Sequence, residues 1–412
     1  MTLRSTLFSK EAYEVFGFAD FRRFIFARIL LTLAVQIQNV TLFWQIFAIT
    51  GDPLSLGLIG LAEFVPAMVV TLYAGHLADK YDRKKIAFFS LLLFIVSSFF
   101  LFLFAVELIV VTSTLPIYIV IFISGIARGF YRPASFALMT QLVPRRLYPK
   151  SAAWNSTLWQ ASSVSGAALG GVIIGFIGIG TSYFTAFMLI SVGSLLIYGI
   201  KSKTLIELKD QIPLLESLSA GVKFVFGNQV ILSAMALDLV AVLFGGAVAL
   251  LPAFAKDILF VGPVEYGLLH AAPAAGAIVT ALYLAYKPPV KKAGMNLIIA
   301  VAGFGVCMIF FALSTNFYIS LFVLALSGLF DSISVVIRST IMQLLTPDQM
   351  RGRVSAVNTL FIGSSNELGA FESGVMARLI GIVPSVVLGG SVAVIAAFSS
   401  YKIAPKLKKL SF

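Results

Sequence analysis

Long apolar segments alternate with short polar connections along the whole chain. An α-helix needs about 20 apolar residues to cross the roughly 30 Å hydrocarbon layer of a membrane. The apolar segments predict spans at residues 22–49, 54–78, 86–106, 115–142, 152–177, 181–200, 228–255, 264–286, 294–314, 317–345, 353–379 and 382–402. The pattern therefore predicts an all-α integral membrane protein with twelve transmembrane helices.

Basic residues collect in every second connection. Connections 51–53, 107–114 and 178–181 contain no Lys or Arg, whereas the connections that alternate with them are basic. Cytoplasmic loops of membrane proteins carry an excess of Lys and Arg. We therefore expect both termini in the cytoplasm. The net charge of +12 then reflects topology, and we expect no nucleic-acid partner.

Composition argues against a soluble protein and against an enzyme. Of the 412 residues, 59% are hydrophobic and 12% are charged, whereas soluble domains carry about 25% charged residues. One cysteine excludes an internal disulfide. Two separated histidines and that cysteine form no metal-ligand cluster, and no nucleotide-binding Gly-Lys-Ser/Thr loop occurs. We expect neither a metal nor another cofactor.

The two halves of the chain repeat each other on either side of a polar linker at 201–227, which includes an amphipathic helix from about Leu214. Residues at one constant offset match: Asn155 with Asn358, Ser162 with Ser365, Gly166 with Gly369, and Gly171 with Gly374. Parallel repeats of this kind are typical of transporters. The sequence predicts an N-terminal six-helix bundle at 1–200, a cytoplasmic linker at 201–227 and a C-terminal six-helix bundle at 228–412.

A charged loop between the second and third spans carries a family resemblance. Six of the eleven residues in 75–85 are charged. Gly75, Asp79, Arg83 and Lys84 fit the loop signature of the major facilitator superfamily, although Asp82 replaces its second glycine. The resemblance implies two pseudo-symmetric six-helix bundles and secondary transport by alternating access, with these four residues as a gating loop. A loop that only sets topology is the alternative.

Other stretches, including 50–57, 346–353 and 365–374, resemble the branch with enterobactin exporters and macrolide efflux pumps, which are drug:proton antiporters. The resemblance implies proton-coupled export of a small amphipathic compound, drug-like or siderophore-like. We expect a monomer in the lipid bilayer of a bacterial cytoplasmic membrane.

The antiporter signature of the fifth span is incomplete. Gly166, Gly170 and Gly171 keep its glycines, which permit close helix packing, but alanine replaces its proline. Uptake or lipid flipping by the same fold therefore stays open.

Charged residues inside predicted spans fall into two groups. Glu63, Asp238 and Glu367 lie deep and have no obvious partner on their own helices. Buried carboxylates can bind and release protons as their access to water changes, so these three are candidates for proton coupling. A structural hydrogen-bonding role is the alternative.

The second group lies nearer the inner surface. Arg128, Arg132, Asp331 and Arg338 occupy helices that the repeat relates to each other. We expect them to form ion pairs between helices and between bundles, with snorkelling of single side chains to the interface as the alternative.

The first span carries a polar stripe. Arg28, Gln36, Asn39 and Phe43 recur at helical spacing. The first helix lines the central cavity in the superfamily, so the resemblance implies that these residues contact a small-molecule substrate. Packing against lipid or another helix is the alternative for the aromatic ring.

Overall fold

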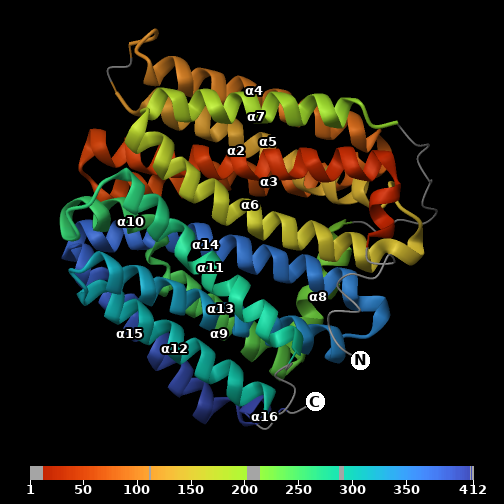
Figure 1. Ribbon diagram of the computed structural model, residues 1–412. Coiled ribbons are helices and arrows are strands. Elements are labelled where there is room, and N and C mark those ends of the chain that lie inside the picture. Colours follow the sequence, from red (N-terminus) through yellow and green to blue (C-terminus); the bar gives the residue numbers. More distant parts are fainter. Residues whose placement is uncertain (1–12, 111–112, 202–213, 287–291, 409, 411–412) are drawn as a thin grey trace. The chain divides into compact units, whose positions relative to one another are not determined.

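The computed structural model describes residues 13–110, 113–201, 214–286, 292–408 and 410, and the regular elements in them are all helices (Figure 1). Each predicted span coincides with a long helix. The bounds differ by at most four residues, at Tyr148, except for the span predicted at 228–255, where α9 ends at Gly245 and short helical turns follow to Ile258. The predicted all-α membrane fold is confirmed.

The helices of the first half are α2 (Ala19–Thr50), α3 (Pro53–Lys80), α4 (Arg83–Ala105), α5 (Leu115–Met139), α6 (Tyr148–Phe176) and α7 (Ile179–Tyr198). Those of the second half are α9 (Gln229–Gly245), α11 (Pro263–Tyr286), α12 (Ala293–Leu313), α13 (Phe317–Leu345), α14 (Arg351–Ile380) and α15 (Ile382–Ile403). Short helical turns continue α9 to Ile258, and α8 (Leu214–Gly227) is the expected linker helix. Linker residues 202–213 lie outside the described part.

Within the described residues, eleven helical segments are long and apolar enough to span a membrane. Helix α14 is 30 residues long but is not among them. Its composition explains this, because it carries Arg351, Arg353, Glu367, Glu372 and Arg378.

Polar side chains and glycines define where the helices begin. Asn228 and Asn316 accept hydrogen bonds from the first free N–H groups of α9 and α13, at 2.9–3.2 Å. Gly178 and Gly381 have φ values of +114° and +95° and join α6 to α7 and α14 to α15. Such φ values favour glycine. These two glycines are 203 residues apart, the same offset as Gly166 and Gly369. The two turns therefore occupy equivalent positions in the two repeats.

Helix packing also follows the repeat. Helix α4 packs against α5 and α7, and its counterpart α12 packs against α13 and α15 (Figure 1). Gly166 brings α6 onto α2, since an added Cβ would lie 3.0 Å from the Leu33 carbonyl oxygen. Gly369 brings α14 onto α9 in the same way, since an added Cβ would lie 2.9 Å from the Leu243 carbonyl oxygen. Small residues thus let equivalent helix pairs touch at their backbones.

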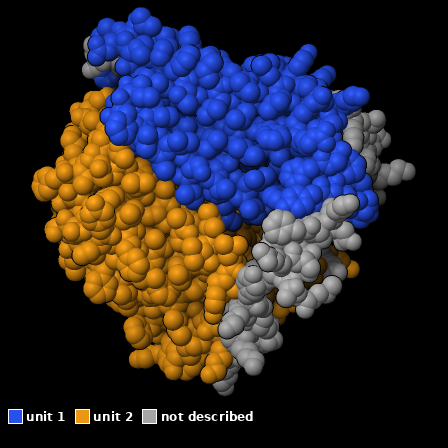
Figure 2. Space-filling view, in the orientation of Figure 1, with its two compact units in different colours: residues 1–42, 62–210 blue, residues 43–61, 211–412 orange. Residues whose placement is uncertain are grey.

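Contacts divide the chain into two compact units, coloured separately in Figure 2. Unit 1 contains residues 1–42 and 62–210, and unit 2 contains residues 43–61 and 211–412. This division crosses α2 and α3, because the hairpin at 43–61 groups with the C-terminal helices. The bundle bounds 1–200 and 228–412 stay a prediction.

We predict opposite effects of alanine at two glycines of α14. Gly369→Ala should destabilise the protein by about 1–3 kcal/mol, because the new methyl group overpacks against α9 backbone. Gly363→Ala should be neutral or stabilise by up to about 1 kcal/mol, because its Cβ would enter open space and alanine favours helix. Thermal unfolding of the purified variants tests this. Equal effects at both positions would contradict the packing.

Candidate functional site

A cavity of about 230 Å³ lies within unit 1, between α2, α4, α5, α6 and α7. A neighbouring cavity of about 320 Å³ shares three of its lining residues, Arg28, Arg132 and Trp159. Pockets that bind small molecules are concave, mostly apolar and carry a few placed polar groups. These cavities fit that description, with Leu91 and Phe94 among the apolar residues.

Helix α2 contributes a polar face to the cavity. Arg28, Thr32, Gln36 and Asn39 all line it, because residues spaced by three or four share one face of a helix. The Gln36 side-chain amide donates to Ser163 Oγ on α6 at 3.2 Å, which fixes its orientation. Phe43, the fourth predicted cavity residue, is not among the residues that line the cavity and belongs to unit 2.

Helix α5 contributes Arg128, Tyr131 and Arg132. Arg128 forms an ion pair with Glu63 of α3, with 2.6 Å between Nη2 and Oε1. Gly125, one turn earlier, makes this pairing possible, because an added Cβ there would lie 2.3 Å from the Glu63 carbonyl oxygen. Only a glycine lets α5 approach α3 so closely. The partner that Glu63 lacks on its own helix therefore comes from the neighbouring helix.

Unit 2 contains a second buried ion pair. Asp238 of α9 and Arg338 of α13 are 2.5 Å apart, and their side chains are only 7% and 6% exposed. Asp331 lies two helical turns before Arg338 on α13. The pair joins two helices of the same unit. Pairing between bundles, which we expected for these arginines, stays a prediction.

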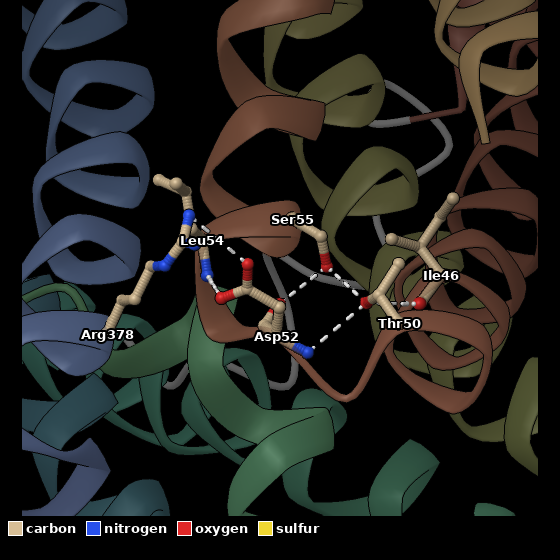
Figure 3. A network of polar contacts seen from close by, with 6 residues as sticks. All are labelled: Ile46, Thr50, Asp52, Leu54, Ser55 and Arg378. Carbon is tan, nitrogen blue, oxygen red and sulfur yellow. Dashed lines mark hydrogen bonds and ion pairs between the residues drawn. The ribbon is translucent and has the colours of Figure 1, made fainter. Parts of the chain in front are cut away.

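A polar network closes the hairpin between α2 and α3 (Figure 3). The Asp52 carboxylate accepts a hydrogen bond from Leu54 N at 3.0 Å and pairs with Arg378 of α14 at 3.5 Å. Thr50 and Ser55 hydroxyl groups are 2.8 Å apart across the turn. The charge pattern predicts that this hairpin faces outward. Sequence reasoning noted Asp52 only as part of a family-like motif and did not find its partner.

The hairpin also packs tightly against helices of unit 2. An added Cβ at Gly374 of α14 would lie 3.1 Å from Gly57 Cα. Trp44 stacks on Tyr266 of α11, with ring centroids 5.5 Å apart. Glu367 lies at the same crossing, since its Oε2 would be 3.1 Å from a Cβ added at Gly60. One predicted coupling residue is therefore part of this packing.

The charged loop joins α3 and α4. Gly75 and Asp79 belong to the last turns of α3, and the side chain of Asp79 lies outside the described part. Arg83 donates to the Ala137 carbonyl oxygen at 3.3 Å, and Lys84 Nζ lies 5.2 Å from the centre of the Tyr198 ring. Asp82, the departure from the family signature, caps α4 by accepting from Lys84 N at 2.9 Å. A gating role of the loop stays a prediction.

Comparison with known proteins decides the family. The profile of the transmembrane secretion effector family matches residues 12–410. The chain belongs to this family of the major facilitator superfamily. It is therefore a secondary transporter in a membrane, and not an enzyme.

Two curated proteins are similar in sequence. The enterobactin exporter EntS of Citrobacter koseri is 26% identical over 365 residues, which cover 87% of this chain and 83% of that protein. An uncharacterized MFS-type transporter of Bacillus subtilis, YkuC, is 26% identical over 151 residues, and this match spans 33% of YkuC. These bacterial relatives suggest the cytoplasmic membrane.

Solved transporter structures share the fold. A bacterial homologue of the human lysosomal transporter Spinster has a TM-score of 0.74 at 14% identity, covering 95% of this chain and 98% of that chain. The nucleoside transporter NupG has a TM-score of 0.70 at 14% identity, covering 94% and 99%. At these identities the likeness establishes the fold alone.

We predict strong coupling between Asp238 and Arg338. Replacing Arg338 by Leu should destabilise unit 2 by about 3–5 kcal/mol, because the aspartate is left charged and buried. Adding Asp238→Leu should recover a large part of that loss, because the uncompensated charge is gone. Thermal unfolding of the single and double variants measures the coupling. The more exposed pair Arg23–Asp20, with side chains 44% and 18% exposed, is the control, where each substitution should change stability by about 1 kcal/mol or less. A double variant with the summed losses of the singles would refute the prediction.

Proposed function

We propose that this transporter exports a small amphipathic compound in exchange for protons by alternating access. The observation that carries alternating access is the division of the α2–α3 hairpin. Its tip, residues 43–61, packs with α11 and α14, while the remaining parts of both helices belong to unit 1. A transporter that opens its cavity to the outside must separate such a tip from the helices that hold it. The exposed Asp52–Arg378 pair suits a contact that breaks and reforms.

The direction of transport is inferred from the family. Its description is a secretion effector, and the relative that matches most of the chain is an enterobactin exporter. The orientation with both termini in the cytoplasm is part of this proposal. The cavity of unit 1 would then receive substrate between helices that carry both polar and apolar side chains.

Glu367 and Glu63 are the proposed proton sites. Glu367 contacts the hairpin tip at Gly60 of α3. Glu63, three residues after Gly60 on α3, forms an ion pair with Arg128 of α5. Protonation of either carboxylate would remove a charge at a helix contact. Such a change biases the equilibrium between two packed arrangements, which is the requirement for coupling.

Proton coupling is tested in inverted membrane vesicles with an imposed pH gradient, using enterobactin and the macrolide erythromycin as probes. We expect accumulation of one probe in inverted vesicles and no accumulation in right-side-out vesicles. Glu367→Gln should abolish the dependence on the pH gradient while exchange of labelled for unlabelled probe continues. Glu372→Gln, one and a half turns further along α14, is the control and should retain the dependence. A wild-type pH response in Glu367→Gln would remove that residue from the coupling mechanism.

A further inference from the structure

A small cavity inside unit 2 brings two carboxylates and one arginine together. Asp331 and Ser334 of α13 line it, as does Asp238 of α9. Arg338 lies one turn beyond Ser334 on the same face of α13 and pairs with Asp238 at 2.5 Å. We propose that this cluster binds one proton and that Asp331 carries it.

The charges of the cluster do not balance. Two carboxylates and one guanidinium group leave one negative charge when both acids are ionised. Arg338 is already paired with Asp238, whereas Asp331 has no ion-pair or hydrogen-bond partner among the described residues. An ionised carboxylate without a partner is costly in a transmembrane helix, and a bound proton removes its charge. Asp331 is therefore the group that takes the proton.

No other charge within the described surroundings of the cavity offsets this excess. Helices α11, α12 and α14 also pack against α13, and none of their described charged residues lines the cavity. Arg338 and Asp331 act on the charge of Asp238, and Arg338 acts on that of Asp331. The remaining walls are apolar: Ala241, Val242, Ala300, Val301, Phe304 and Phe330.

A buried hydroxyl group at the cavity supports the same site. Ser334 is 3% exposed, and its Oγ has no hydrogen-bond partner among the described residues. Thr340 on the same helix instead donates to the Val336 carbonyl oxygen at 2.9 Å, so an unpartnered hydroxyl group is not general in α13. A hydroxyl group can accept a hydrogen bond from a protonated acid and donate one to an ionised acid. Ser334 thus offers Asp331 a partner in either state.

The size of the cavity distinguishes a proton from a larger ligand. Its volume is about 10 Å³, which holds about one water molecule. A transported compound or a hydrated metal ion does not fit. Asp331 is partly exposed, so protons can reach it, whereas Asp238 and Arg338 are each only 5% exposed.

Release of the proton would change the contact between α9 and α13. A charged Asp331 would compete with Asp238 for Arg338, whose buried Nε has no hydrogen-bond partner among the described residues. The bound proton therefore keeps Arg338 on α9. The site is separate from Glu367 and Glu63, and it holds whether or not the protein exports its substrate, so its test is independent of the proposed function.

Infrared spectroscopy of the purified protein in lipid nanodiscs tests the site, because a protonated carboxylic acid has a C=O stretch distinct from that of a carboxylate. Spectra are taken at about pH 7, where an aspartate in water is ionised. Asp331→Asn should remove the intensity of one acid group. Asp238→Asn should remove the same intensity, because Asp331 then becomes the partner of Arg338 and ionises. Asp20→Asn, in the more exposed pair with Arg23, is the control and should leave the acid band unchanged.

Melting temperature gives a second measure. A proton that is bound in the folded state and released on unfolding makes stability fall as pH rises. The wild-type melting temperature should therefore fall as pH rises above about 5, and Asp331→Asn should reduce this fall. Asp331→Glu keeps an acid at the site and should keep the band intensity at a shifted frequency, so it decides the question if the asparagine variant does not fold.

An acid band that Asp331→Asn leaves unchanged would overturn the proposal, because Asp331 would then be ionised in the folded protein. An acid band that Asp238→Asn leaves unchanged would also overturn it, because the proton would not belong to the cluster. A melting temperature that rises with sodium in place of choline, and that Asp331→Asn makes insensitive to sodium, would assign the site to a metal ion and contradict the proposal.

Discussion

A charge inside a membrane is tolerated only when another charge or polar group faces it, and this constraint organises both units of the protein. Glu63 and Arg128 join α3 to α5 in unit 1, and Asp238 and Arg338 join α9 to α13 in unit 2. Removing one member of such a pair leaves the other unbalanced in a medium of low polarity. Each pair therefore holds two helices together and restricts where further charge can be placed. Arg28, Arg128 and Arg132 also line the cavity of unit 1.

Small residues make the ionic contacts geometrically possible. Gly125 allows α5 to approach α3 at Glu63, and Gly57 with Gly374 allows the hairpin tip to pack on α14 beside Glu367. Transmembrane helices gain little from burying apolar surface, because lipid is equally apolar, so close backbone packing matters more. Glycines and charged residues thus act together at these crossings. At Gly125 the glycine sets the distance at which Arg128 reaches Glu63.

The sequence was sufficient for the helices and insufficient for their contacts. The span bounds follow from hydropathy, because the thickness of the hydrocarbon layer sets helix length. They agree with the helix bounds to within four residues, except in the seventh span, where α9 ends at Gly245 and short helical turns follow to Ile258. The stripe of Arg28, Gln36 and Asn39 was predictable because one helix carries it. The partners of Glu63, Asp238 and Asp52 were not predictable, since each lies on another helix and depends on tertiary packing. Phe43 continues the stripe by helical spacing, yet its contacts place it in unit 2.

In the proposed transport cycle, the hairpin tip at 43–61 leaves α11 and α14 once per turnover. A reversible cross-link tests it most directly, with Asp52→Cys and Arg378→Cys joined by a short bis-methanethiosulfonate in a Cys307→Ala background. We predict that the cross-linked transporter accumulates no probe in inverted vesicles. Reduction should restore transport, and either cysteine alone should be insensitive to the reagent. Transport by the cross-linked protein at the rate of the reduced protein would show that the tip does not have to separate from α14.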